Sequence, residues 1–160
     1  MAAFRTEPTL DDIAAVRRIV TSTGFFREDE IGIAVELVEE RLDDGLEASG
    51  YHFVFADAQT GGAAGYACFG PIPCSLTSWD LYWIAVDAAA QRGGLGRALL
   101  EAAEASIRAQ GGKAIYIETS AKPQYDATRF FYEACGYGLE HVFEDFYAPG
   151  DGKAVYSKRL

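Results

Sequence analysis

The segment from residue 79 to residue 110 constrains the fold of this chain more than any other part of its sequence. Residues 79–86 are apolar or aromatic at almost every position, which is typical of a central β-strand covered on both faces. Residues 94–110 follow after a short glycine-rich loop, and their apolar or small side chains recur at the spacing of one helix face. These side chains are Leu95, Leu99, Ala102, Ala103 and Ser106. A buried strand that leads into an amphipathic helix favours an α/β fold.

Two helices are predicted before this segment. Thr9 is expected to cap a first helix that runs to about Ser22, because a threonine hydroxyl can accept a hydrogen bond from the first helical turn. A second helix is predicted over residues 28–44, with Gly45 as its stop. Its apolar stripe consists of Ile31, Val35, Val38 and Leu42.

The remaining elements complete a mixed sheet. The β-prone runs are residues 4–6, 51–58, 63–69, 113–118, 138–147 and 153–159, and a short helix is predicted over residues 125–135. Residues 51–58 and 63–69 are expected to pair antiparallel, since Gln-Thr-Gly-Gly between them is a turn sequence. The sequence therefore predicts an α/β (α+β) fold, a twisted mixed sheet of about six to seven strands with helices on both faces.

Length and composition limit the class of protein. A chain of 160 residues suits one domain, here expected over residues 1–160. No apolar run approaches the roughly 20 residues of a membrane-spanning helix, and the first residues lack a secretory signal, so a cytoplasmic protein without a membrane partner is expected. Three cysteines without a Cys-x-x-Cys pair indicate neither a disulfide framework nor a metal site. The net charge of −10 argues against a nucleic-acid partner.

Much of the negative charge is local. Residues 28–47 hold nine acidic side chains and one basic side chain, Arg41. One interpretation is a solvated helix face that maintains solubility, and the other is an acidic wall that attracts cationic amines. The sequence leaves both open.

The glycine-rich loop predicts an anion site. Residues 91–98 read Gln-Arg-Gly-Gly-Leu-Gly-Arg-Ala, and the amides of a first helical turn carry the positive end of the helix dipole. Two arginines flank these glycines, and guanidinium groups suit phosphate oxygens, so a pyrophosphate is the expected ligand. A P-loop is excluded, because no Gly-Lys-Ser/Thr is present. A dinucleotide-binding loop fits the glycine spacing poorly, although Glu118 stands at a suitable distance to bind a ribose.

Three segments of the chain resemble the GCN5-related N-acetyltransferase (GNAT) family. They are Asp-Leu-Tyr-Trp-Ile-Ala-Val at residues 80–86, the Q/R-x-x-G-x-G/A loop at residues 91–96, and Thr-Arg-Phe-Phe-Tyr-Glu-Ala-Cys-Gly-Tyr at residues 128–137. The order of strands and helices resembles the family over nearly the whole chain. The resemblance implies acetyl-CoA as co-substrate, with its pyrophosphate on the loop and its pantetheine arm and acyl carbonyl beside the preceding strand. The residues implied are Gln91, Arg92, Gly93, Gly94, Leu95, Gly96 and Arg97 for the loop and Ile84, Ala85 and Val86 for the strand.

The resemblance also implies catalytic residues. Tyr132 matches the family's general acid, and a phenol with a pKa near 10 keeps its proton at neutral pH while a thiol with a pKa near 8.5 leaves. Asp80 is the candidate base, as it stands six residues before Val86, where some histone-type relatives place a glutamate; a water chain is the alternative. Tyr125 and Arg129 are expected to share a helix face with Tyr132 and to contact the coenzyme. Many relatives carry asparagine at the position of Tyr125, so this chain departs from the family's pattern there.

The expected activity is direct transfer of an acetyl group from acetyl-CoA to a primary amine in a ternary complex, without a metal. The acceptor, a small molecule or a peptide, is not readable from the sequence, and homodimerisation through the terminal strands is left open. Two other classes of protein stay as alternatives: a non-catalytic acyl-CoA-binding or sensor domain and a nucleotide-dependent oxidoreductase.

Overall fold

The protein contains a seven-stranded mixed sheet and four α-helices, as seen in a computed structural model that describes residues 2–160. The strands are β1 (Ala3–Arg5), β2 (His52–Asp57), β3 (Ala63–Pro71), β4 (Ser78–Val86), β5 (Ala114–Ser120), β6 (Gly138–Ala148) and β7 (Asp151–Arg159). The helices are α1 (Asp11–Ser22), α2 (Glu28–Ser49), α3 (Leu95–Ala109) and α4 (Asp126–Ala134), with short 3-10 turns at Ala88–Ala90 and Pro123–Tyr125. The strand order is β1-β2-β3-β4-β5-β7-β6. This arrangement confirms the predicted mixed sheet.

Two compact units make up the chain. The first unit combines the residues up to Gly70 with Tyr82–Ser106, and the second combines Pro71–Leu81 with Ile107–Leu160. β4 and α3 therefore each contribute residues to both units. None of the helices within residues 2–160 has the length and apolar character that crossing a membrane requires.

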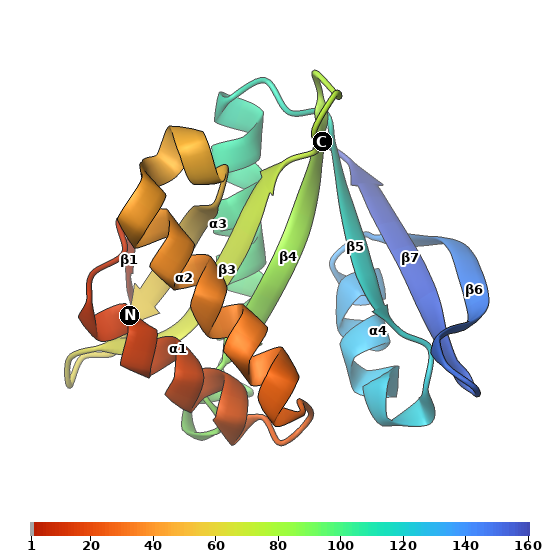
Figure 1. The fold of residues 1–160 in the computed structure, drawn as a ribbon, viewed down its shortest axis with the longest axis horizontal. Helices are drawn as coiled ribbons and strands as arrows, with labels where there is room; N and C mark the ends of the chain where they lie inside the picture. Colours follow the sequence, from red (N-terminus) through yellow and green to blue (C-terminus); the bar gives the residue numbers. More distant parts are fainter. Residues whose placement is uncertain (1) are drawn as a thin grey trace. The chain divides into compact units, whose positions relative to one another are not determined.

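The core of the first unit lies beneath α1 and α2, which cover one face of its strands, while α3 covers the other (Figure 1). Val16, Ile19 and Val20 of α1 are completely buried. They share one hydrophobic cluster with residues of α2, β2 and β3, namely Ile31, Ala34, Val35, Val38, Phe53, Phe55, Tyr66 and Cys68. Burying these side chains on one helix face supplies most of the driving force that holds both helices on the sheet.

An ion cluster fastens the start of the chain. The Arg5 guanidinium donates to Asp12 at 2.6 and 2.8 Å and to Asp57 at 2.8 Å, which links β1, α1 and β2. Thr9 was expected to cap α1, but the direction is reversed, since the Thr9 amide and hydroxyl donate to the Asp12 carboxylate. Burial alone would raise the pKa of Asp12, yet the bonds from Arg5 and Thr9 outweigh it and the pKa is lowered.

Gly45 interrupts α2 without ending it. Its φ of 83° and ψ of 175° break the helical backbone where the sequence predicted a stop, but the helix resumes as far as Ser49. The helix then ends at Gly50, which takes the left-handed conformation favoured at helix ends. The predicted stop at Gly45 is therefore confirmed as a break in the helical backbone, and a short helical segment that the sequence did not predict follows it to Ser49.

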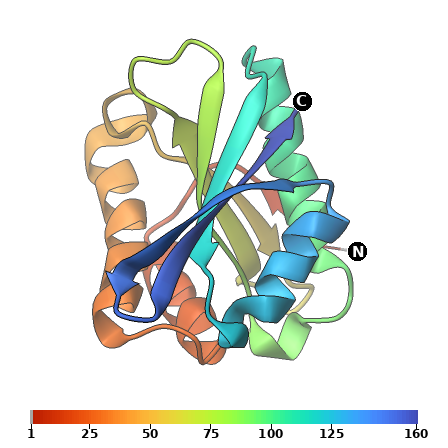
Figure 2. The same cartoon turned by 90° about the vertical axis from the view of Figure 1, so that its right-hand side faces the viewer.

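The second unit is built on β5, β7 and β6. Both pairs are antiparallel, and β4 contributes its first four residues as a parallel neighbour of β5. The long β6–β7 hairpin and α4 are drawn in blue in Figure 2. The Tyr156 hydroxyl donates to Glu133 at 3.0 Å, which ties β7 to α4.

The prediction that residues 79–86 form a central strand is confirmed, but their coverage on both faces is not. Only Trp79, Leu81 and Ala85 of β4 are buried, and Tyr82 is exposed. The aromatic side chains in this run are therefore in part surface groups.

Gly70 marks the tightest backbone approach in the first unit, and we expect Gly70→Ala to destabilise the protein. An added methyl group would overlap the Gly50 carbonyl oxygen and lie 2.9 Å from the Tyr82 ring. The free energy of unfolding should fall by about 1–3 kcal/mol, as for other overpacked sites. Urea denaturation measures this change.

Gly32→Ala is the matched control, because a methyl group there meets no atom within 4 Å and the residue lies inside α2. This variant should be as stable as the parent protein or gain up to about 1 kcal/mol. If G70A were as stable as G32A, the close approach of Gly70 to the Gly50 carbonyl oxygen would be contradicted.

Candidate functional site

The last residues of β4 lead directly into the predicted anion site. Ala85 is buried in the core beneath α1 and α2, and Val86 lies on the opposite side, close to Gly65 and Leu99. Ile84 is half-buried. The Gln91 side-chain amide donates back to the Val86 carbonyl at 3.2 Å, so the loop is tied to the strand end.

The loop itself is exposed and adopts an unusual backbone. Arg92 and Gly94 have φ values of +70° and +79°. Glycine adopts such positive φ values readily, whereas residues with a side chain rarely do. Gly93 lies between Arg92 and Gly94 with a φ outside this range, and a methyl group on it would meet no atom of the protein within 4 Å. The packing of the chain therefore does not require glycine at position 93, and the loop is open to solvent on this side.

The loop ends in the first turn of α3. Leu95 and Gly96 begin α3, where the first backbone amides of an α-helix have no partner within the helix, and the helix dipole adds positive potential at this end. Arg92 and Arg97 are both exposed beside these amides. This combination of donors and positive charge suits a phosphate group.

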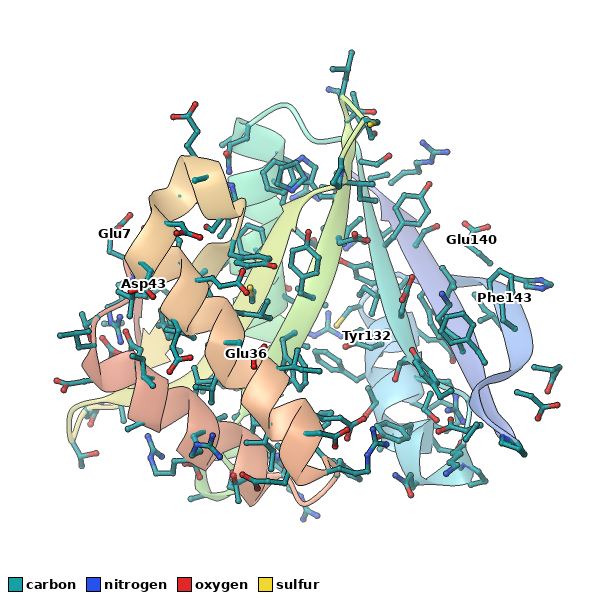
Figure 3. The ribbon with its side chains drawn as sticks, viewed as in Figure 1. Glu7, Glu36, Asp43, Tyr132, Glu140 and Phe143 are labelled. Atoms are coloured by element: carbon teal, nitrogen blue, oxygen red, sulfur yellow. The ribbon has the colours of Figure 1, made fainter. Side chains whose placement is uncertain are left out.

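Tyr132 lies in the last turn of α4 in the second unit and is labelled in Figure 3. It is 6 % exposed, and its ring packs against Tyr137 and Tyr156 at centroid distances of 6.1 and 6.3 Å. Burial, and next the nearby Cys135 thiol, raise the pKa of Tyr132 above its usual value. The phenol is therefore a hydrogen-bond donor throughout the neutral pH range.

Asp80 lies on β4 opposite Tyr116 of β5 and is half-buried. Burial, and next the negative charge of Glu118 on β5, raise the pKa of Asp80. Glu118 was considered in the sequence only as a ribose ligand, and its role beside Asp80 could not be read from sequence spacing. A carboxylate with a raised pKa is a stronger base than an ordinary aspartate.

Arg129 and Tyr132 lie three residues apart in α4 and share a helix face as expected, but Tyr125 lies outside the helix. Tyr125 belongs to the 3-10 turn that Pro123 begins, and α4 starts only at Asp126. The Arg129 guanidinium donates to the carbonyls of Ser120 and Lys122 at 2.6 and 3.0 Å and also pairs with Asp126. Arg129 thus orders the segment between β5 and α4.

The predicted residues fall into two groups. Ile84, Ala85, Val86 and the loop are continuous in the first unit, whereas Asp80, Tyr125, Arg129 and Tyr132 belong to the second. Within residues 2–160, no cluster of three or more His, Cys, Asp or Glu side chains is arranged to hold a metal ion.

Comparison with known proteins gives a consistent result. The model of the acetyltransferase (GNAT) family matches residues 17–137. A crystal structure of a protein assigned to the GNAT family of acetyltransferases, from Desulfovibrio desulfuricans, is 46 % identical, with a TM-score of 0.96 and 99 % of both chains covered. No curated protein matches the chain.

More distant structures share the fold. An aminoglycoside 6'-N-acetyltransferase complexed with coenzyme A is 17 % identical, with a TM-score of 0.77 over 98 % of this chain and 96 % of the other. The ribosomal-protein-S18-alanine N-acetyltransferase from Escherichia coli is 22 % identical, with a TM-score of 0.75 over 100 % and 94 %.

Asp80→Asn is expected to stabilise the protein at neutral pH. A raised pKa means that the folded protein favours the neutral carboxyl group of Asp80. The stability that this neutral group contributes is fully present below the ordinary pKa of 3.8 and is lost as the pH rises through the pKa of the folded state. At pH 7 the ionised carboxylate therefore weakens the fold, and asparagine avoids this effect. Thermal unfolding of both proteins should show a higher midpoint for D80N at pH 7 and no difference below pH 3.8.

Asp43→Asn provides the control, because Asp43 projects from α2 into solvent (Figure 3). It should leave the midpoint at pH 7 unchanged. A D80N protein that is less stable than the parent at pH 7 would show that the carboxylate is favoured in the fold.

Proposed function

Because the chain belongs to the acetyltransferase (GNAT) family, we propose that it transfers an acetyl group from acetyl-CoA to a primary amine. The observation that carries this proposal is the exposed glycine-rich loop at the start of α3, with Arg92 and Arg97 exposed on either side of the first helical residues. Backbone amides, a helix dipole and two arginines there suit the coenzyme A pyrophosphate. One structural relative, the aminoglycoside 6'-N-acetyltransferase, was crystallised with coenzyme A.

The loop and β4 have separate roles in the proposed complex. Residues 91–97 bind the pyrophosphate, and the main chain of Ile84, Ala85 and Val86 aligns the pantetheine arm and the acyl carbonyl. A backbone donor aimed at the thioester oxygen stabilises most when negative charge develops there, in the tetrahedral transition state. The rigid core around Ala85 keeps this strand end in place.

Tyr132 is the proposed acid. Its raised pKa keeps the proton on the phenol, although a phenol with a pKa above 10 transfers its proton uphill to a thiolate whose conjugate acid has a pKa near 8.5. Tyr132 therefore stabilises the departing thiolate chiefly by a hydrogen bond. Tyr125 and Arg129 are proposed coenzyme contacts, with Arg129 acting mainly through the segment that it orders.

Asp80 is the proposed base. A lysine-like ammonium has a pKa near 10.4, so the amine must lose a proton before it attacks, and the raised pKa of Asp80 makes that transfer easier. The attack is direct. Among the thiols, Cys68 is fully buried and its pKa is raised by burial, so it is a poor candidate for an acyl-enzyme intermediate.

A cationic amine is the proposed class of acceptor. Glu36 and Asp43 project outward from α2 (Figure 3), and Arg41, the one basic residue in the acidic segment, is buried and paired with Glu7. The exposed face of α2 is therefore acidic without compensation from Arg41. A single domain over residues 1–160, a cytoplasmic location and homodimerisation stay predictions.

The first test is thermal unfolding with acetyl-CoA, coenzyme A or NAD at matched concentrations. A ligand that binds only the folded protein stabilises it by about 2.7 kcal/mol at a hundredfold excess over its dissociation constant. We expect acetyl-CoA and coenzyme A, but not NAD, to raise the midpoint of thermal unfolding.

Gly93→Leu sharpens this test. The residue is exposed and a Cβ added there would meet no protein atom within 4 Å, so the unliganded midpoint should not change, whereas the shift caused by acetyl-CoA should be lost. A stabilising effect of NAD alone would exclude the proposed coenzyme and support an oxidoreductase.

Tyr132→Phe tests the proposed acid. The ring and its contacts with Tyr137 and Tyr156 remain, so the fold should be retained, but kcat should fall by about 100-fold or more because the hydroxyl group is gone. Release of free thiol from acetyl-CoA, measured against a panel of cationic amines, reports kcat. A Y132F enzyme with full kcat would exclude Tyr132 as the acid, and coenzyme binding without turnover in the parent protein would favour a sensor domain.

A further inference from the structure

The turn between β4 and the glycine-rich loop is held by side chains of α1. Asp87 begins this turn, and its Oδ1 accepts a hydrogen bond from the Ala89 amide at 3.0 Å. The Asp87 amide donates to the Ala64 carbonyl at 2.8 Å, which fixes the turn to β3. Gln91, the first residue of the loop, follows four positions after Asp87.

Arg18 of α1 connects this turn to the sheet. Its guanidinium pairs with the Oδ2 atom of Asp87 and donates from the other amino group to the Ala63 carbonyl at 2.8 Å. One planar group thus bridges a carboxylate in the turn and the first residue of β3. Hydrogen bonds to a charged group are stronger than neutral ones, so this bridge restricts the position of Asp87.

Ser22 makes a second connection one helical turn later. Its hydroxyl oxygen accepts a bond from the Ala88 amide at 3.0 Å and its proton is donated to the Ile19 carbonyl at 2.6 Å. Positions 18 and 22 lie on the same face of α1, so both bonds reach the turn from one side. α1 is itself immobilised by completely buried side chains, so it is a rigid support.

The Arg18–Asp87 pair also has an electrostatic effect. A carboxylate four residues before an anion site would repel a pyrophosphate, and the neighbouring guanidinium cancels that charge. Asp87 can therefore shape the turn without weakening the binding of an anion.

We propose that Arg18 and Ser22 are positioning residues for coenzyme binding: they hold the turn at Asp87 so that residues 91–97 keep the conformation that binds pyrophosphate, and Arg18 also cancels the charge of Asp87. This inference rests on the proposed function, because it assigns these residues to the same coenzyme site. It adds two residues of α1 whose hydrogen bonds reach the turn at Asp87 and Ala88, before the loop begins.

Arg18→Gln is the main variant, and Arg17→Gln is its matched control. Arg17 is the neighbouring residue on α1 and pairs with Glu28 on the surface. The dissociation constant of coenzyme A, measured by calorimetry, should rise about tenfold in R18Q and stay within about twofold in R17Q, as expected for the loss of one charge-assisted contact. In steady-state kinetics, R18Q should raise KM for acetyl-CoA with kcat within about twofold, a separation that general destabilisation would not produce.

Two further variants resolve the roles of charge and position. Ser22→Ala should weaken coenzyme A binding about threefold, because one neutral hydrogen bond to the turn is lost. Asp87→Asn keeps an acceptor for the Ala89 amide, so the R18Q/D87N double variant should bind coenzyme A several-fold more tightly than R18Q. A double variant that binds no more tightly than R18Q overturns the charge-cancelling role of Arg18.

The outcomes separate the two proposals. If the parent protein binds coenzyme A and R18Q binds it as tightly as R17Q does, the positioning role is overturned while the proposed function stands. If the parent protein binds neither coenzyme A nor acetyl-CoA, the proposed function fails first, and the positioning role fails with it.

Discussion

Burial of one face of α1 against the strands of the first unit is the interaction on which the candidate coenzyme site depends. Val16, Ile19 and Val20 have no solvent exposure, so the helix cannot shift without exposing apolar surface to water. The polar side chains of the same helix are therefore held in fixed positions. Hydrophobic burial fixes the position of α1, and from this helix Arg18 and Ser22 make hydrogen bonds to the turn that precedes the glycine-rich loop.

Periodicity in the sequence predicts the elements of this fold better than it predicts their ends. The apolar stripe of α2 and the antiparallel pairing of β2 with β3 are confirmed, because each depends on side-chain spacing within one segment. The errors occur where a local rule competes with a tertiary contact. Thr9 is a residue type that often caps helices by accepting a hydrogen bond. Here Asp12, which also pairs with Arg5, accepts a hydrogen bond from the Thr9 amide. At Gly45 the backbone breaks as its residue type suggests, yet the helix continues afterwards.

The same distinction applies to the candidate site. The glycine-rich loop and Tyr132 are candidates that the sequence alone provides, because each belongs to a short continuous motif. The Arg18–Asp87 pair is not such a candidate, since 69 positions separate its members and nothing in either neighbourhood indicates the other. The influence of Glu118 on Asp80 is likewise a product of parallel pairing between β4 and β5. Local sequence thus provides the candidate catalytic groups, while the residues that contact or influence these candidates become visible only in the fold.

The Arg5–Asp12–Asp57 cluster has a consequence for the way in which the protein begins to unfold. β1 has only three residues and buries none of them, so charge and backbone pairing rather than apolar contact retain it. Because the pKa of Asp12 is lowered, its carboxylate stabilises the folded protein fully at pH values above the ordinary pKa of 3.8. This stabilisation is lost as the pH falls through the pKa of Asp12 in the folded state. Acid therefore weakens the attachment of the N-terminal strand, whereas the apolar contacts beneath α1 contain no carboxyl group and do not depend on pH in this way.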